Sequence, residues 1–214
     1  MAVLYSAPMD IGQVLLGAAV VIVAYLVGGI PFGVVVARVT GGPDPRTIGS
    51  GRTGGANTMR ALGPKLALVA GLLDAAKGAV VVLIAIAVGG GLLVQILAAL
   101  AAILGHSRSI WIGFSGGRGI APAFGGLVVI APLVALIIVP IFVIVLVVSR
   151  YSSVASLTAT AVGALLVVGM VVLYQLSPLY AVYAIAAAVM IWLFHLDNIQ
   201  RLLAGSERRI EWHG

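Results

Sequence analysis

The sequence predicts an all-α integral membrane protein, a polytopic bundle of about seven transmembrane helices. Its composition is the first reason: 62% of the 214 residues are apolar and 8% are charged, whereas soluble domains have about 45–50% apolar and about 25% charged residues. So few polar groups cannot cover a surface that faces water, which excludes a soluble enzyme and a disordered chain. The second reason is that long apolar runs alternate with short polar loops. We therefore expect residues 1–214 to form a single membrane domain.

The apolar runs indicate where the helices lie. They are Ile11–Ala37, Leu66–Val88, Leu92–Leu104, Ile120–Ser149, Val154–Leu176 and Leu179–Phe194. The first run is broken by Gly28, Gly29 and Pro31; no basic segment precedes it, so we expect a retained span and not a cleaved leader. The third run covers only about 20 Å at 1.5 Å per residue, which is short for a complete span.

The fourth run determines the number of crossings, because it can form one tilted helix or two helices that meet at Ala131-Pro132. With two helices, the chain crosses seven times and every lysine and arginine of the loops and the tail lies on one side. With one helix, Arg150 and the tail arginines move to the opposite side. The positive-inside rule therefore favours seven crossings, with the N-terminus outside and the C-terminus in the cytoplasm. The helix before Pro132 is then too short to cross alone, and we expect it to lie among its neighbours.

Charge and residue types narrow the function further. The chain has no cysteine, which excludes disulfides, thiolate nucleophiles and cysteine metal sites. Its six acidic residues are scattered, so the sequence predicts no metal site and no cofactor. The net charge of +6 favours lipid head groups or small anionic substrates as partners, and not nucleic acid.

A glycine-rich segment, residues 49–60, is the first candidate for a binding site. Closely spaced glycines such as Gly51 allow several backbone N–H groups to point at one centre, and Ser50, Asn57 and Arg60 add polar and charged donors. This composition suits the oxygens of a phosphate or an acyl phosphate. The alternative is a flexible loop whose arginines contact anionic lipid head groups.

The second candidate is the segment 105–119, which we expect to be a polar loop. Its last residues, Gly116, Gly117, Arg118 and Gly119, lead into an apolar helix, so their amides and the guanidinium can hold a phosphate at a helix N-terminus. The alternative is a tight turn with a snorkelling Arg118. His106 is a candidate general base or a hydrogen-bond donor to a phosphate. The alternative is a loop histidine that is merely hydrogen-bonded.

Two further segments carry charge. Asp74 and Lys77 lie on one face of a helix, and we favour a structural ion pair that neutralises both over a contact with substrate. In the tail, Asn198 and Arg201 share one face of a short helix whose other face is apolar. That pattern is also typical of an amphipathic helix at the membrane interface.

Taken in order, the motifs resemble the bacterial acyl-phosphate:glycerol-3-phosphate acyltransferase family of the PlsY type. The matching segments run from Gly29-Ile30-Pro31-Phe32-Gly33 through the glycine-rich loop, Leu73-Asp74-Ala75-Ala76-Lys77-Gly78, Gly105-His106, Gly116-Gly117-Arg118-Gly119 and Arg150-Tyr151 to Asn198-Ile199-Gln200-Arg201-Leu202-Leu203-Ala204-Gly205. The resemblance implies a seven-helix enzyme of the bacterial inner membrane, with its motif loops in the cytoplasm. It also implies transfer of a fatty acyl group from acyl phosphate to glycerol 3-phosphate, which gives lysophosphatidic acid and phosphate in phospholipid synthesis.

The chain departs from the family pattern at four positions of these motifs. Arg52 replaces an asparagine and Ala56 a threonine, while Arg118 replaces a lysine and Asp197 a glutamate. Replacing a lysine by an arginine keeps the positive charge but exchanges a compact ammonium for a planar guanidinium group. A different donor or acceptor therefore remains an alternative.

The residues also suggest how the reaction would proceed. An acyl phosphate has a good leaving group, so the protein mainly needs to hold two anions together and stabilise an oxyanion. We expect the phosphates to contact Ser50, Arg60, Arg118 and the amides of Gly116 to Gly119. Asn198 and Arg201 are expected to place the glycerol, and the acyl chain to lie among the short apolar helices. The leading alternative is a transporter or channel for an organic phosphate, but the two halves contain no internal repeat and the basic loops lie on one face.

Overall fold

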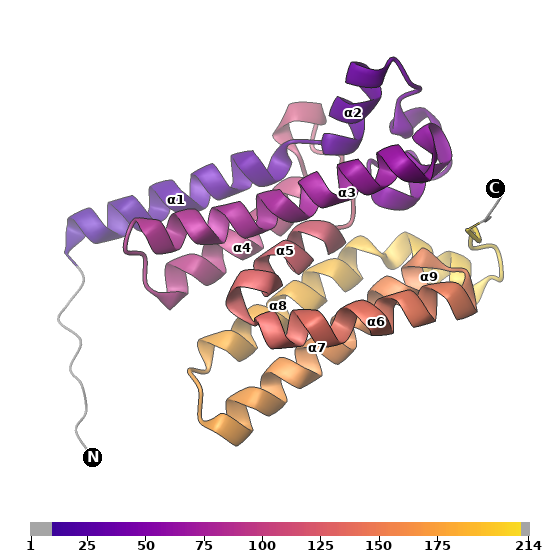
Figure 1. The fold of residues 1–214 in the computed structure, drawn as a ribbon. Helices are drawn as coiled ribbons and strands as arrows, with labels where there is room; N and C mark the ends of the chain where they lie inside the picture. The colour runs from indigo at the N-terminus through magenta and orange to yellow at the C-terminus, as the bar shows by residue number, and fades with distance from the viewer. Residues whose placement is uncertain (1–9, 211–214) are drawn as a thin grey trace.

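The computed structural model describes residues 10–210, which form helices joined by short turns (Figure 1). The helices are α1 (Ile11–Gly29), α2 (Phe32–Thr40), the 3-10 turn η1 (Pro45–Thr47), α3 (Gly55–Ala87), α4 (Leu92–Ser107), the 3-10 turn η2 (Ile110–Ile112), α5 (Ile120–Ile130), α6 (Pro132–Ser149), α7 (Ser152–Tyr174), α8 (Leu179–Phe194) and α9 (Leu196–Leu203). No strand is present between residues 10 and 210, which agrees with the predicted all-α class.

The helices form two groups joined by α5. On one side α1, α3 and α4 pack against one another, and on the other side α6 and α8 each pack against α7 (Figure 1). The short α5 lies between the groups and contacts α3, α4, α6 and α8. As predicted, the run Ile120–Ser149 forms two helices that meet at Ala131, and the shorter one lies among its neighbours.

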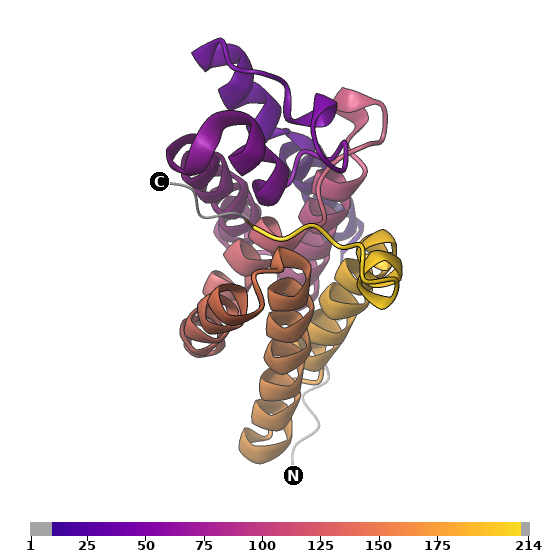
Figure 2. The same ribbon diagram turned by 90° about the vertical axis from the view of Figure 1, so that its right-hand side faces the viewer.

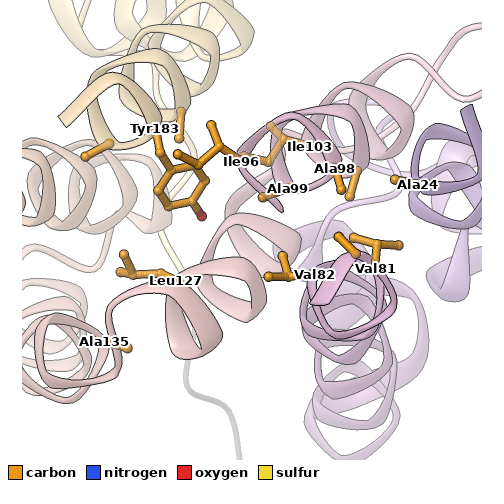
Figure 3. Packing of buried hydrophobic residues seen from close by; sticks show 14 of the residues in the cluster. Ala24, Val81, Val82, Ile96, Ala98, Ala99, Ile103, Leu127, Ala135 and Tyr183 are labelled. Atoms are coloured by element: carbon orange, nitrogen blue, oxygen red, sulfur yellow. The ribbon is translucent and has the colours of Figure 1, made fainter. Parts of the chain in front are cut away.

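Small residues allow the helices of the first group to approach closely. Ala98 and Ala99 of α4 are buried in the core with Val81 and Val82 of α3 (Figure 3). Ala102 of α4 is buried in the same cluster. A Cβ atom on Gly28 of α1 would collide with the backbone of Ala102, and one on Gly105 would collide with the Tyr25 carbonyl oxygen. Packing of this kind holds helices together in lipid, where burial of apolar surface contributes little.

The outer surface of the bundle is apolar. Large side chains such as Leu136, Val148, Leu165 and Leu173 are exposed, which is stable only against lipid. By length and composition α1, α3, α6 and α7 can each cross a membrane, and α8 with α9 forms a fifth, bent candidate. The apolar helices α4 and α5 are shorter.

Three boundaries differ from those predicted. The first apolar run breaks into α1 and α2 at Ile30, as its Gly28, Gly29 and Pro31 predicted, but its second helix ends at Thr40 and not at Ala37. The end of the predicted glycine-rich loop is helical, because α3 begins at Gly55. This helix bends at Gly63, whose φ of +80° is accessible to glycine, and at the following Pro64.

The third difference concerns residues 105–107, which were predicted to begin a loop. They form the last turn of α4, and the N–H of Arg108 still bonds to the Leu104 carbonyl at 2.7 Å. The polar side chains of His106 and Ser107 are buried there, 6% and 0% exposed. The helix continues because its polar end packs against other polar groups of the protein and not against water.

Candidate active site

A polar cavity of about 200 Å³ lies at the end of the bundle where the motif segments meet. Figure 2 looks onto this end, which the chain after α9 crosses. The cavity is lined by Ser50, Arg52, Gly54, Gly55, Ala56, Asn57, Arg60, Gly71, Asp74, His106, Arg118, Ile120, Ala121, Phe142, Ser152, Ser156, His195, Asn198, Arg201, Glu207 and Arg208. Five arginines among these residues give the cavity a positive charge.

Asn57 holds the glycine-rich loop in shape. Its amide nitrogen donates to the carbonyls of Ile48 at 2.8 Å and Arg52 at 3.0 Å. Its amide oxygen accepts from the backbone N–H of Ser50 at 3.3 Å and from Arg60 at 3.1 Å. Because Asn57 is 3% exposed and bonded on both sides, its side chain acts chiefly within the loop.

The second motif forms a tight turn that packs on the end of α4. The N–H of Gly117 donates to the His106 carbonyl at 3.1 Å. A Cβ atom on Gly117 would collide with Nε2 of His106, so only glycine fits this contact. Gly119 has a φ of +83°, which also favours glycine. Ser109 ties the preceding turn to α1 through a bond from its hydroxyl to the Gly29 carbonyl at 2.6 Å.

Arg118 joins this turn to α9. Its Nη2 donates to Oδ2 of Asp197 at 2.8 Å, and the same oxygen lies 3.3 Å from Nη1 of Arg201. The Asp197 carboxylate is therefore held between the guanidinium groups of Arg118 and Arg201. Nε of Arg118 is buried without a hydrogen-bond partner among residues 10–210, so it is free to bind a further acceptor.

Glu207 of the tail closes the cavity on the α9 side. One carboxylate oxygen accepts from Ser153 at 3.1 Å and from Asn198 at 2.5 Å. The other accepts from Nε of Arg201 at 2.7 Å. This contact fixes the orientation of Asn198 and Arg201, both of which the sequence assigned to the glycerol moiety.

Asp74 and Lys77 form the ion pair that their spacing predicted. Nζ of Lys77 lies 2.6 Å from Oδ1 of Asp74, with the side chains 2% and 6% exposed. The same ammonium donates to the Ile30 carbonyl at 2.7 Å and lies 3.0 Å from Nδ1 of His106. The pair therefore joins α3 to the α1–α2 junction and to the polar end of α4.

An apolar groove of about 480 Å³ adjoins the polar cavity. It runs between α3, α5, α6, α7 and α8, and its lining includes Leu72, Phe124, Ile138, Ala164 and Tyr183. The groove and the cavity share five residues, which are Gly71, Ile120, Ala121, Phe142 and Ser156. The two spaces therefore meet in the middle of the bundle.

Most of the site residues predicted from the sequence line the polar cavity. These are Ser50, Asn57, Arg60, His106, Arg118, Asn198 and Arg201. The glycines Gly51, Gly116, Gly117 and Gly119 do not line it and shape the backbone around it. Sequence reasoning gave no role to Ser152, Ser156, His195, Glu207 or Arg208; an acidic residue, Glu207, beside the basic residues of the tail was the one available signal.

A basic cavity that opens into an apolar groove inside a helical membrane protein defines the class: a membrane protein that handles anionic, lipid-like molecules. The chain belongs to a family whose model, described as glycerol-3-phosphate acyltransferase, matches residues 18–205. This confirms the resemblance stated from the motifs, and the protein is accordingly an acyltransferase.

Relatives of known name match over most of their length. A glycerol-3-phosphate acyltransferase 3 of Dehalococcoides mccartyi (strain CBDB1) is 37% identical over 203 residues, 89% of this chain and 94% of the relative. A glycerol-3-phosphate acyltransferase of Synechococcus sp. (strain JA-3-3Ab) is 44% identical over 186 residues, 87% of this chain and 89% of the relative.

Two solved structures are similar in fold. Both are crystal structures of PlsY, an integral membrane glycerol 3-phosphate acyltransferase, at 36% sequence identity and covering 91% of this chain. The glycerol 3-phosphate form has a TM-score of 0.82, and the match covers 96% of its chain. The lysophosphatidic acid form has a TM-score of 0.81, and the match covers 95% of its chain.

Proposed function

We propose that the protein transfers a fatty acyl group from acyl phosphate to glycerol 3-phosphate, giving lysophosphatidic acid and inorganic phosphate in phospholipid synthesis. The observation that carries this proposal is the junction of the basic cavity with the apolar groove. A phosphorylated head fits the first and a fatty chain fits the second. The solved relatives support it, because one is a glycerol 3-phosphate form and the other a lysophosphatidic acid form.

In the reaction, the primary hydroxyl oxygen of glycerol 3-phosphate attacks the acyl carbonyl carbon. A new C–O ester bond forms, and the C–O bond to the phosphate breaks with the electron pair leaving on phosphate. We assign the binding of the two phosphates to Ser50, Arg60 and Arg118, which line the cavity. The amides of Gly116 to Gly119, which the sequence also suggested, are left out because these glycines do not line the cavity and the N–H of Gly117 is bonded to the His106 carbonyl. Asn198 and Arg201 place the glycerol. The hydroxyl proton has two candidate acceptors, His106 and a phosphate oxygen of a substrate.

The topology that goes with this function has seven crossings. Besides the long helices, α4 and α5 complete the count, with the N-terminus outside, the C-terminus in the cytoplasm and the whole chain acting as one domain. The cavity then faces the cytoplasm of the bacterial inner membrane, where both phosphorylated substrates are soluble or accessible. Accessibility of single cysteines, which can be introduced freely because the chain has none, measures this topology.

Enzyme and transporter are separated by one assay. Purified protein in detergent or lipid should convert acyl phosphate and glycerol 3-phosphate into lysophosphatidic acid. Uptake of glycerol 3-phosphate into sealed proteoliposomes without any acylation would instead support transport of an organic phosphate.

The apolar groove is expected to select the length of the fatty acyl chain of the donor. Ala164 lines it about 12 Å along α7 from Ser156, at a rise of 1.5 Å per residue. Ala164→Trp should fill the distal part of the groove, so that transfer from palmitoyl phosphate falls about tenfold or more while octanoyl phosphate is still used. Acylation rates with the two donors measure this. Val172→Trp on the exposed surface of the same helix is the control, and equal loss with both donors would contradict the assignment.

Replacing Arg52 is expected to weaken the binding of a phosphorylated substrate. Its side chain lines the cavity but forms no ion pair or hydrogen bond within residues 10–210, whereas Arg118 and Arg201 are paired with carboxylates. Its charge is therefore available to a substrate phosphate. Arg52→Asn should raise the KM for a phosphorylated substrate by about tenfold, the loss of one charge-assisted contact, with a smaller change in kcat. The exposed Arg209→Asn serves as control, and an unchanged KM would refute the role of Arg52.

A further inference from the structure

The ammonium of Lys77 contacts three groups of the protein. It donates a hydrogen bond to the Ile30 carbonyl at 2.7 Å, forms an ion pair with Oδ1 of Asp74 at 2.6 Å and lies 3.0 Å from Nδ1 of His106. A lysine ammonium has three donors and no acceptor. In the 3.0 Å contact Nδ1 of His106 must therefore accept an N–H of Lys77, and it carries no proton of its own.

The same geometry excludes a charged imidazolium at His106. A proton on Nδ1 would point at the ammonium of Lys77 only 3.0 Å away, so two positive groups would meet donor to donor. Asp74 offsets this repulsion only in part, because its Oδ1 lies 3.5 Å from Nδ1, too far for a good hydrogen bond, and is already paired with Lys77 at 2.6 Å. A neutral imidazole with an accepting Nδ1 has its proton on Nε2.

Nε2 of His106 lies on the side of the second motif. The Cα of Gly117 packs so closely on this edge of the ring that no side chain fits between them. His106 is 6% exposed and lines the polar cavity, and within residues 10–210 no hydrogen bond of Nε2 is present. An Nε2–H group that has no partner in the protein and faces the cavity can donate to an acceptor that enters the cavity, so a substrate oxygen is its natural partner.

We infer that the Asp74–Lys77 pair fixes His106 as an Nε2–H hydrogen-bond donor to an oxygen of the substrate in the cavity, and that His106 is not the general base. Lys77 and Asp74 are positioning residues that act through the imidazole. The identity of the substrate oxygen rests on the proposed function, whereas the protonation pattern of His106 does not. Gly117 completes the arrangement, since a side chain at this position would overlap Nε2.

Nitrogen NMR of protein labelled with ¹⁵N in its histidine rings tests the protonation directly. The full chain in detergent micelles should show His106 with a protonated Nε2 and a bare Nδ1, assigned by the loss of its signals in His106→Gln. His195 provides the opposite reference, because its Nδ1 lies 2.8 Å from the Ile191 carbonyl and must donate to it. Lys77→Met should release His106 from its single tautomer. A protonated Nδ1 at His106 in the wild type would overturn the inference.

Activity measurements test the role of the donor. His106→Gln places an amide N–H near the position of Nε2 and should keep transfer within about tenfold of wild type, whereas His106→Ala and His106→Asn should lose about 10²-fold. A general base would make all three variants equally poor, which would refute the donor role. Absence of lysophosphatidic acid with wild-type protein would refute the proposed function and leave the NMR result standing.

Discussion

Replacing Arg118 by alanine is expected to reduce acyl transfer by about 10²-fold or more, the loss seen when one donor that stabilises developing charge is removed. Arg118 precedes α5, lines the polar cavity and has a buried Nε without a partner in the described chain. The variant should fold, because Asp197 keeps its contact with Arg201. The formation of lysophosphatidic acid from acyl phosphate and glycerol 3-phosphate measures the effect.

Two variants make the Arg118 result specific. Arg118→Lys keeps the charge without the planar fork and should retain part of the activity. Arg38→Ala removes an exposed arginine of α2 that does not line the cavity, and it should leave transfer unchanged. Near-normal turnover of Arg118→Ala would exclude this residue from the phosphate site.

Gly125→Ala is expected to destabilise the bundle by about 1–3 kcal/mol, the usual cost of overpacking. A Cβ atom at this position in α5 would overlap the Ala75 carbonyl oxygen of α3. Reciprocally, a Cβ on Gly78 of α3 would overlap the Pro122 carbonyl of α5. Since α5 follows directly after Arg118, its displacement should lower activity as well as the midpoint of thermal unfolding in detergent.

The matched control for Gly125 is Gly169 in α7. No atom lies within 4 Å of a Cβ built there, so Gly169→Ala should be neutral or stabilise the helix by about 0.5–1 kcal/mol. Equal unfolding midpoints for Gly125→Ala and the wild type would show that the α3–α5 contact is looser than the structure has it.

The apolar runs and their breaks were predictable because they depend on local sequence. Proline at position 132 cannot continue a helix from α5, and the division of the fourth run followed from it. The predicted loop boundary at residues 105–107 was wrong, because a polar helix end can be buried when other polar groups reach it. A hydropathy profile cannot identify those polar partners, because they come from distant segments of the chain.

The sequence by itself determined that the chain is a helical membrane protein, which motif segments carry its chemistry and which family it resembles. These properties follow from composition, the spacing of apolar residues and the order of short motifs. Only the tertiary structure decided that Lys77 contacts Ile30, Asp74 and His106 together, and that Glu207 folds back onto Asn198 and Arg201. Hydrogen-bond partners and protonation depend on distances between residues far apart in the chain, and helix packing alone sets those distances.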